Sequence, residues 1–82
     1  MDFLCEAPGP VRLVDPLAAC AIELASQAPL DLVVVWTDPP RPMLCLEPWS
    51  GPRSSLVSGE RRLTLAPGEI LEMGCRYRVL AA

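Results

Sequence analysis

Leu30-Asp-Leu-Val-Val-Val-Trp36 is the stretch that decides the fold class of this chain. It contains four consecutive apolar residues of types that favour β-strands. Such a run is typical of a strand buried on both faces, as in the centre of a sandwich. Residues 37–42 include three prolines, which remove backbone donors and fix φ, so this segment is predicted to be a loop. Residues 43–46 are apolar and predict a second, shorter strand.

Prolines and glycines interrupt the rest of the chain every few residues, which favours short strands and turns over helices. Residues 20–24 alternate between apolar and polar as a strand does, although residues 16–27 also fit a short helix. The nearby prolines favour the strand. Residues 47–59 are predicted to be a long connection, and Pro67-Gly68 a turn. Regular alternation predicts further strands at residues 11–14, 62–66 and 71–79.

These elements amount to five or six strands with no helix and no internal repeat. The predicted fold is all-β, an antiparallel β-sandwich, in one domain of residues 1–82 with residues 1–8 expected to be disordered. A chain of 82 residues buries only about 60–65% of its unfolded surface. Because 51% of the residues are apolar, we expect an apolar surface that a partner covers.

The charges and the hydropathy argue against several classes of partner. The chain has seven basic residues, all of them arginine, and ten acidic residues, giving a net charge of -3. There is no basic stripe of the kind that nucleic-acid binding needs. No apolar run approaches the roughly 20 residues that span a bilayer. The first ten residues lack the basic region of a signal peptide, so we expect no membrane partner and a cytoplasmic location.

The four cysteines, Cys5, Cys20, Cys45 and Cys75, are spaced too irregularly for a zinc site, and the chain has no histidine. We therefore expect no metal and no cofactor. The cysteines are interpreted as small buried apolar residues rather than as a disulfide framework or as nucleophiles. The lack of histidine also excludes Ser-His-Asp and Cys-His arrangements within this chain.

Glu47 is the candidate site residue that the pattern singles out. It follows the predicted strand at residues 43–46 and precedes Pro48, which restricts Glu47 to an extended backbone. Trp49 and Arg53 follow it closely. A carboxylate at the end of a buried strand, beside an aromatic ring and a guanidinium group, suits chemistry on a polar ligand. The alternative is that Glu47 is simply the first exposed residue after the strand.

The run Val33-Val-Val-Trp-Thr-Asp-Pro-Pro-Arg-Pro-Met-Leu-Cys-Leu-Glu-Pro-Trp-Ser-Gly-Pro52 resembles the closing part of the aldose 1-epimerase (galactose mutarotase) family. In that family a hydrophobic strand ending in Trp-(Thr/Ser) precedes a strand that carries Glu-Pro-Trp. A Leu-x-Pro-Gly-Glu-like turn then leads into the last strand. Leu65-Ala-Pro-Gly-Glu69 and Cys75-Arg-Tyr-Arg-Val79 stand in those places here. The resemblance covers the chain from about Gly9 onward.

The resemblance implies an isomerase that interconverts the α and β anomers of an aldose or, as in the glucose-6-phosphate 1-epimerase branch, of a sugar phosphate. It implies that Glu47 is the general base and that a histidine protonates the ring oxygen. Since this chain has no histidine, the resemblance implies a C-terminal fragment of a larger β-supersandwich, inactive alone. Trp49 can stack on a sugar, and Arg53 and Arg41 can meet a sugar phosphate. A packing role for Trp49 and solvated arginines are the alternatives.

Three functional hypotheses remain open at this point. The first is a partial aldose 1-epimerase. The second is a non-catalytic carbohydrate-binding or protein-interaction module that reuses the strands. The third is one half of a split enzyme, completed by an N-terminal polypeptide that carries the histidine, or by a second copy in a homo-oligomer paired along exposed sheet edges. Whether this chain is itself an enzyme is left open.

Overall fold

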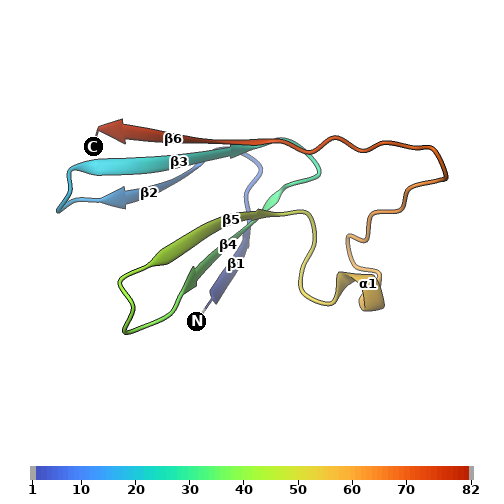
Figure 1. Cartoon of the computed structure of the whole chain (residues 1–82), viewed down its shortest axis with the longest axis horizontal. Helices are drawn as coiled ribbons and strands as arrows, with labels where there is room; N and C mark the ends of the chain where they lie inside the picture. Colours follow the sequence, from blue (N-terminus) through green and yellow to red (C-terminus); the bar gives the residue numbers. More distant parts are fainter. Residues whose placement is uncertain (1, 82) are drawn as a thin grey trace.

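A computed structural model describes residues 2–81, which form two small antiparallel sheets. The first sheet has the strand order β1-β4-β5 and the second β2-β3-β6. The two sheets meet where β3 contacts β5 and diverge from there (Figure 1). The all-β prediction is therefore confirmed. The elements are β1 (Asp2–Glu6), β2 (Val11–Asp15), β3 (Cys20–Ser26), β4 (Leu32–Thr37), β5 (Leu44–Trp49), helix α1 (Ser55–Ser58) and β6 (Cys75–Ala81).

Strand β4 is the central strand of the first sheet, as its apolar run predicts. Leu32, Val33 and Val34 are consecutive and all buried, so both faces of this strand are covered. Val34 pairs with Leu4 of β1 on one side and with Glu47 of β5 on the other. Directly opposed residues point to the same face of an antiparallel sheet. Leu4, Val34 and Glu47 therefore share one face.

Strand β5 is longer than the sequence pattern predicts. It begins at Leu44 and continues through Glu47 and Pro48 to Trp49, so the expected end of the strand at residue 46 is wrong. Proline is tolerated in a strand at the edge of a sheet, where its missing N–H faces outward, and β5 is an edge strand. Glu47 therefore lies within a strand and is half-buried, and it is not the first exposed residue after one.

The second sheet is built around β3, which confirms the strand rather than the helix. Leu24 of β3 is only 1% exposed and lies between Val11 of β2 and Tyr77 of β6. The Tyr77 hydroxyl donates a hydrogen bond of 2.6 Å to the carbonyl oxygen of Leu46 in β5. This bond ties the last strand of the second sheet to the edge of the first.

Several other expectations are wrong. Residues 2–6 form β1 and are not part of a disordered N-terminal segment. Strand β6 begins at Cys75 rather than at residue 71. Residues 62–66 form no strand, and a one-turn helix lies within the connection after β5. The turn at Pro67-Gly68 is present, with Gly68 at φ 84 and the Glu69 N–H bonded to the Ala66 carbonyl oxygen at 3.0 Å.

The cysteines also differ from the expected buried residues. Cys5 and Cys75 are exposed, and Cys20 and Cys45 are half-buried. All four thiols are free. None is packed tightly enough to serve as a core residue, so the apolar interior of both sheets consists of aliphatic side chains.

Candidate functional site

Glu47 and Trp49 lie on the same face of the first sheet, two residues apart on β5. The Trp49 indole Nε1 donates a hydrogen bond to Glu47 Oε1 at 3.2 Å, and both side chains are half-buried. This bond fixes the orientation of the carboxylate and occupies one of its two oxygens. Oε2 remains available to accept a proton or a hydroxyl group.

Arg53 follows β5 in the connection and covers this pair from one side. Its guanidinium carbon lies 5.4 Å from the centre of the Trp49 ring, which is a cation–π arrangement. The same guanidinium group forms an ion pair with Asp2 at the start of β1. The hydrogen bond and the positive charge of Arg53 hold the pKa of Asp2 below its usual value. Arg53 thus occupies one face of the indole ring and links the connection to β1.

A hollow of about 300 Å³ opens beside these residues. Leu4 and Val34 are its apolar residues on the sheet, and Trp49 and Pro52 line it as well. Its charged lining is the Arg53–Asp2 ion pair. An apolar surface with a few polar groups and an aromatic ring is the usual composition of a small-molecule site. Glu47 is not part of the lining but lies next to it, since it pairs with Val34 and bonds Trp49.

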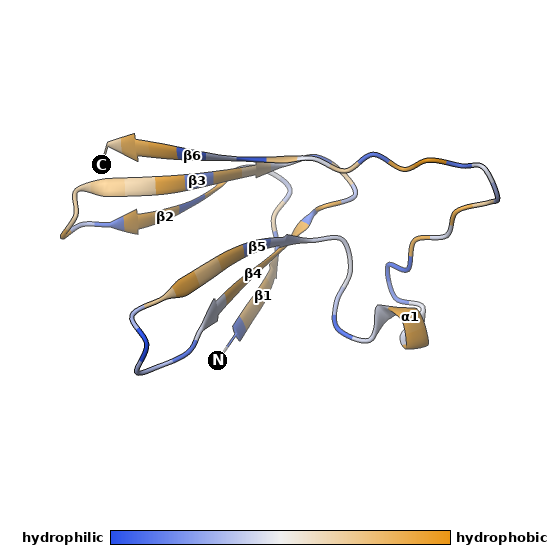
Figure 2. Ribbon diagram, in the orientation of Figure 1, coloured by the Kyte–Doolittle hydropathy of each residue, from blue (hydrophilic) through white to orange (hydrophobic). Residues whose placement is uncertain are grey.

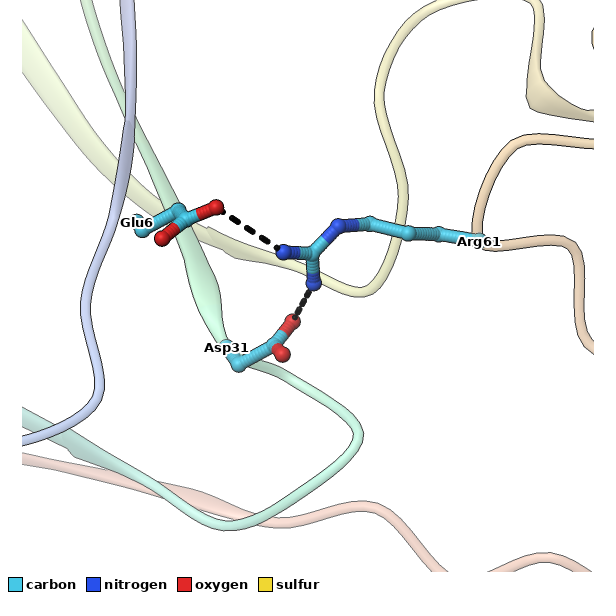
Figure 3. A network of polar contacts seen from close by, with 3 residues as sticks. All are labelled: Glu6, Asp31 and Arg61. Atoms are coloured by element: carbon cyan, nitrogen blue, oxygen red, sulfur yellow. Dashed lines mark hydrogen bonds and ion pairs between the residues drawn. The ribbon is translucent and has the colours of Figure 1, made fainter.

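A second hollow of about 180 Å³ adjoins the first, since Leu4 and Pro52 line both. Its charged centre is Arg61, whose guanidinium group bonds Asp31 at 2.6 Å and reaches Glu6 at 3.4 Å (Figure 3). The hydrogen bond that Arg61 donates to Asp31 raises the pKa of Arg61 above its usual value. Arg61 therefore fastens the connection after β5 to the end of β1 and to the turn before β4.

Tyr77 stands on the other side of β5. Partial burial raises the pKa of its hydroxyl above 10.0, and the nearby Cys75 and Glu47 raise it further. The hydroxyl therefore stays protonated at neutral pH, as its hydrogen bond to the Leu46 carbonyl requires. Because Glu47 contributes to this shift, the carboxylate influences groups beyond its own sheet.

The structure thus brings Glu47, Trp49 and Arg53 together, as their spacing suggested. Arg41 is not part of the group. It lies in the loop between β4 and β5, at the opposite end of β5 from Trp49, where its Nε bonds Asp38 at 2.7 Å.

Comparison with family models, with curated proteins and with solved structures finds no match to this chain. The family resemblance therefore rests on the quoted residues alone. Residues 2–81 hold no cluster of acidic and cysteine side chains arranged to bind a metal ion. In the same range, no helix has the length and apolar character needed to cross a membrane.

The sequence reasoning missed Asp2, Leu4 and Arg61. Asp2 and Leu4 belong to β1, and the signal for this strand was the apolar run Phe3-Leu-Cys5 between two acidic residues. Arg61 had no local signal. Its backbone is left-handed, with φ 54, and its partners Asp31 and Glu6 are 30 and 55 residues away in the sequence.

Proposed function

We propose that this chain supplies the closing β-strands and the general base of an aldose 1-epimerase-like sugar isomerase. The observation that carries the proposal is the grouping of Glu47, Trp49 and Arg53 beside a hollow on one face of a sheet. The hollow is at the small end of the size range of ligand sites, which suits a single sugar ring. An apolar floor and an indole ring suit the apolar side of that ring.

In this mechanism Glu47 removes the proton from the anomeric hydroxyl of the sugar. The C–O bond between the anomeric carbon and the ring oxygen breaks, and the ring oxygen takes a proton from a general acid. The open-chain aldehyde rotates and closes on either face, and the two protons return. Trp49 bonds one oxygen of Glu47, so the other oxygen carries the proton. Glu47 and the general acid must lie within hydrogen-bond reach of the sugar, on opposite sides of the breaking bond.

The general acid comes from outside this chain, because the chain has no histidine. We place the two sheets within a larger β-supersandwich whose other strands bring that acid to the Glu47 face. The chain alone is then inactive or nearly so. A cytoplasmic setting belongs to the proposal, and the four free thiols support it, since cysteines stay reduced in that compartment.

A non-catalytic carbohydrate-binding module is the second candidate, and one observation favours it. The hollow is lined by Asp2, Leu4, Val34, Trp49, Pro52 and Arg53. Glu47 is absent from that lining, so the hollow can hold a sugar without engaging the base. The isomerase requires Glu47 for anomer exchange, whereas the module binds a sugar without exchange and without Glu47.

Anomer-exchange NMR on glucose, galactose and glucose 6-phosphate distinguishes them. We expect the folded chain alone to leave exchange at the spontaneous rate. Imidazole added to the sample can stand in for the missing acid. With imidazole, we expect the chain to accelerate exchange beyond imidazole alone, and Glu47→Gln to abolish the gain.

Binding is measured in the same samples from line broadening of the sugar signals. Binding that survives Glu47→Gln, with no imidazole-dependent exchange in the original chain, establishes the module and refutes the isomerase. Absence of binding by all three sugars refutes both candidates. Arg41→Gln is the matched control, because Arg41 lies at the far end of β5, and we expect it to behave as the original chain.

A further inference from the structure

A third hollow lies at the end of the second sheet, where β3 stops and β6 starts. Its volume is about 310 Å³, similar to that of the hollow beside Trp49 and at the small end of the range for ligand sites. None of its residues lines either of the two hollows described above, so it is separate from the sugar site. It is lined by Ala25, Ser26, Gln27, Gly74, Cys75 and Arg76.

Two side chains at this hollow carry N–H donors, the Gln27 amide and the Arg76 guanidinium group. Arg76 pairs with Ala25 across the two strands. The pairing continues beyond the strand ends, because the Gln27 N–H bonds the Gly74 carbonyl oxygen at 3.0 Å. Residues two apart along a strand share a face. The side chains of Gln27 and Arg76 therefore lie on the same face of the sheet, on either side of Ala25.

Gly74 makes room for the Gln27 amide on this face. A Cβ atom at position 74 would lie 2.7 Å from Gln27 Nε2, which is too close for a real Cβ atom. The φ of Gly74 is not positive, so the backbone does not itself require glycine here. The absence of a side chain at Gly74 thus allows the amide to lie across the neighbouring strand. The next residue on the same face is Arg76, so the two donor groups are neighbours.

Arg76 differs from the other arginines of the chain. In six of the seven, the guanidinium group bonds or pairs with a carboxylate or with a backbone carbonyl oxygen, namely in Arg12, Arg41, Arg53, Arg61, Arg62 and Arg78. Neither the Arg76 guanidinium group nor the Gln27 amide has such a partner within residues 2–81. Guanidinium and amide N–H groups are strong donors. Both are therefore available to a ligand that carries oxygen acceptors.

The face that carries this hollow is positively charged. Its charged strand residues are Arg12, Arg76 and Arg78 against Glu23, which pairs with Arg12 at 3.0 Å and with Arg78 at 4.0 Å. Three positive charges and one negative charge attract anions locally, although the net charge of the chain is -3. Glu72, the acidic residue nearest to Arg76 in sequence, is not part of the lining. Figure 2 shows the hydrophilic colour along the middle of β6.

We propose that this hollow binds an oxyanion, the phosphate or carboxylate group of a small molecule, between the Arg76 guanidinium group and the Gln27 amide. The planar guanidinium group can donate two parallel hydrogen bonds to two oxygens of such a group. The Gln27 amide then donates to a further lone pair of the same group. A phosphate dianion gains more than a carboxylate from the local excess of positive charge, so we expect phosphate to bind more tightly.

The oxyanion site does not rest on the proposed function. The sugar site uses the first sheet and the connection after β5. The oxyanion site uses the face of the second sheet that points away from the first sheet, since Tyr77 reaches the Leu46 carbonyl oxygen from the opposite face of β6. Either site can be absent without the other being affected.

Titration of the full, ¹⁵N-labelled chain with inorganic phosphate and with acetate, followed by NMR, tests the proposal. Gln27 is the only residue of the chain with a side-chain amide, because there is no asparagine and no second glutamine. Its NH₂ signals therefore report this hollow without ambiguity. We expect them to shift saturably with phosphate and more weakly with acetate. Sodium chloride at the same ionic strength is the blank, and we expect it to produce no saturable shift.

Arg76→Met keeps an apolar stem of similar length and removes the charge without adding an amide signal. We expect it to raise the dissociation constant of phosphate at least about tenfold. Arg41→Met is the matched control, because Arg41 pairs with Asp38 in the loop between β4 and β5. We expect it to bind phosphate as the original chain does. Gly74→Ala displaces the Gln27 amide, and we expect a smaller loss of affinity.

The pattern of shifts decides the outcome. Saturable binding that is lost in Arg76→Met and kept in Arg41→Met supports the site, and the tighter of the two anions identifies the class of ligand. Gln27 signals that move no further with phosphate and acetate than with sodium chloride overturn the proposal. It is also overturned if Arg76→Met, with the signal dispersion of a folded chain, binds as tightly as Arg41→Met.

Discussion

The two sheets have three strands each, yet they are covered to very different extents. In the first sheet, β4 has three consecutive buried residues, because β3 contacts β5 and the two ends of the connection, Pro52 with Arg53 and Glu60 with Arg61, lie against the sheet. In the second sheet, the buried residues are Ala21 and Leu24, and Val79 is 78% exposed. In each sheet the central strand pairs with a neighbour on both sides. The burial of residues in a three-stranded sheet therefore depends on what lies over the faces of the sheet.

The largest loss of stability is expected from shortening a buried side chain in the first sheet. Val33→Ala removes two methyl groups from a residue that is 2% exposed. The lost burial of the methyl groups and the cavity that they leave should together lower the free energy of unfolding by about 2 kcal/mol. Urea denaturation followed by tryptophan fluorescence measures the change, since Trp36 lies in the same strand.

Val14→Ala is the matched change in the second sheet. Val14 is 55% exposed, so the free energy of unfolding should change by less than about 0.5 kcal/mol. Equal losses for the two variants would contradict the difference in coverage between the sheets.

The strands of highest apolar content were predictable from sequence. The run around Val33 specifies a buried strand because β-branched residues pack well on a pleated surface and leave few alternatives. The strand at β3 was also predicted, although its register was not. The grouping of Glu47 and Trp49 followed from alternation along one strand, and Arg53 from its nearness in sequence.

The remaining features depended on tertiary contacts that alternation does not report. Residues 62–66 alternate as a strand does, but no strand edge in residues 2–81 pairs with them. β1 is short, and it forms because β4 offers an edge with which it can pair. The role of Arg61 depends on residues 30 and 55 positions away. A local pattern shows which segments can pair and not which partner is within reach.

A smaller loss of stability is expected where the two sheets are in contact. Tyr77→Phe removes the hydrogen bond to the Leu46 carbonyl and should lower the free energy of unfolding by about 1 kcal/mol. The side chain is half exposed, which limits the loss. Denaturation at neutral pH measures it, and a change indistinguishable from zero would mean that this bond does not hold the sheets together.

The same variant has a pH signature. The folded pKa of Tyr77 is raised above 10.0, so its contribution to stability is present below pH 10 and is lost as the pH rises through the folded pKa. Tyr77→Phe should remove this part of the alkaline loss of stability. The chain has one tyrosine, so phenolate absorbance reports its titration directly. An onset of ionisation at the ordinary pKa would refute the shift.

The smallest effect is expected at the ion pairs that fasten the connection to the first sheet. Arg61→Gln removes the bonds to Asp31 and Glu6. Exposed ion pairs contribute little, so the melting temperature should fall by only about 2–4 °C at low salt. Because salt screens exposed charges, the difference from the original chain should shrink at high salt.

Arg62→Gln is the control that distinguishes the loss of the Arg61 bonds to the first sheet from the loss of one positive charge. Arg62 bonds the Leu56 carbonyl at 3.1 Å within the same connection, so its removal leaves the link to the first sheet intact. We expect Arg62→Gln to melt above Arg61→Gln at low salt and the two variants to converge at high salt. Equal melting temperatures at low salt would mean that the connection stays on the first sheet without Arg61. The coverage of that sheet would then depend on the apolar contacts around Leu4 and Pro52 alone.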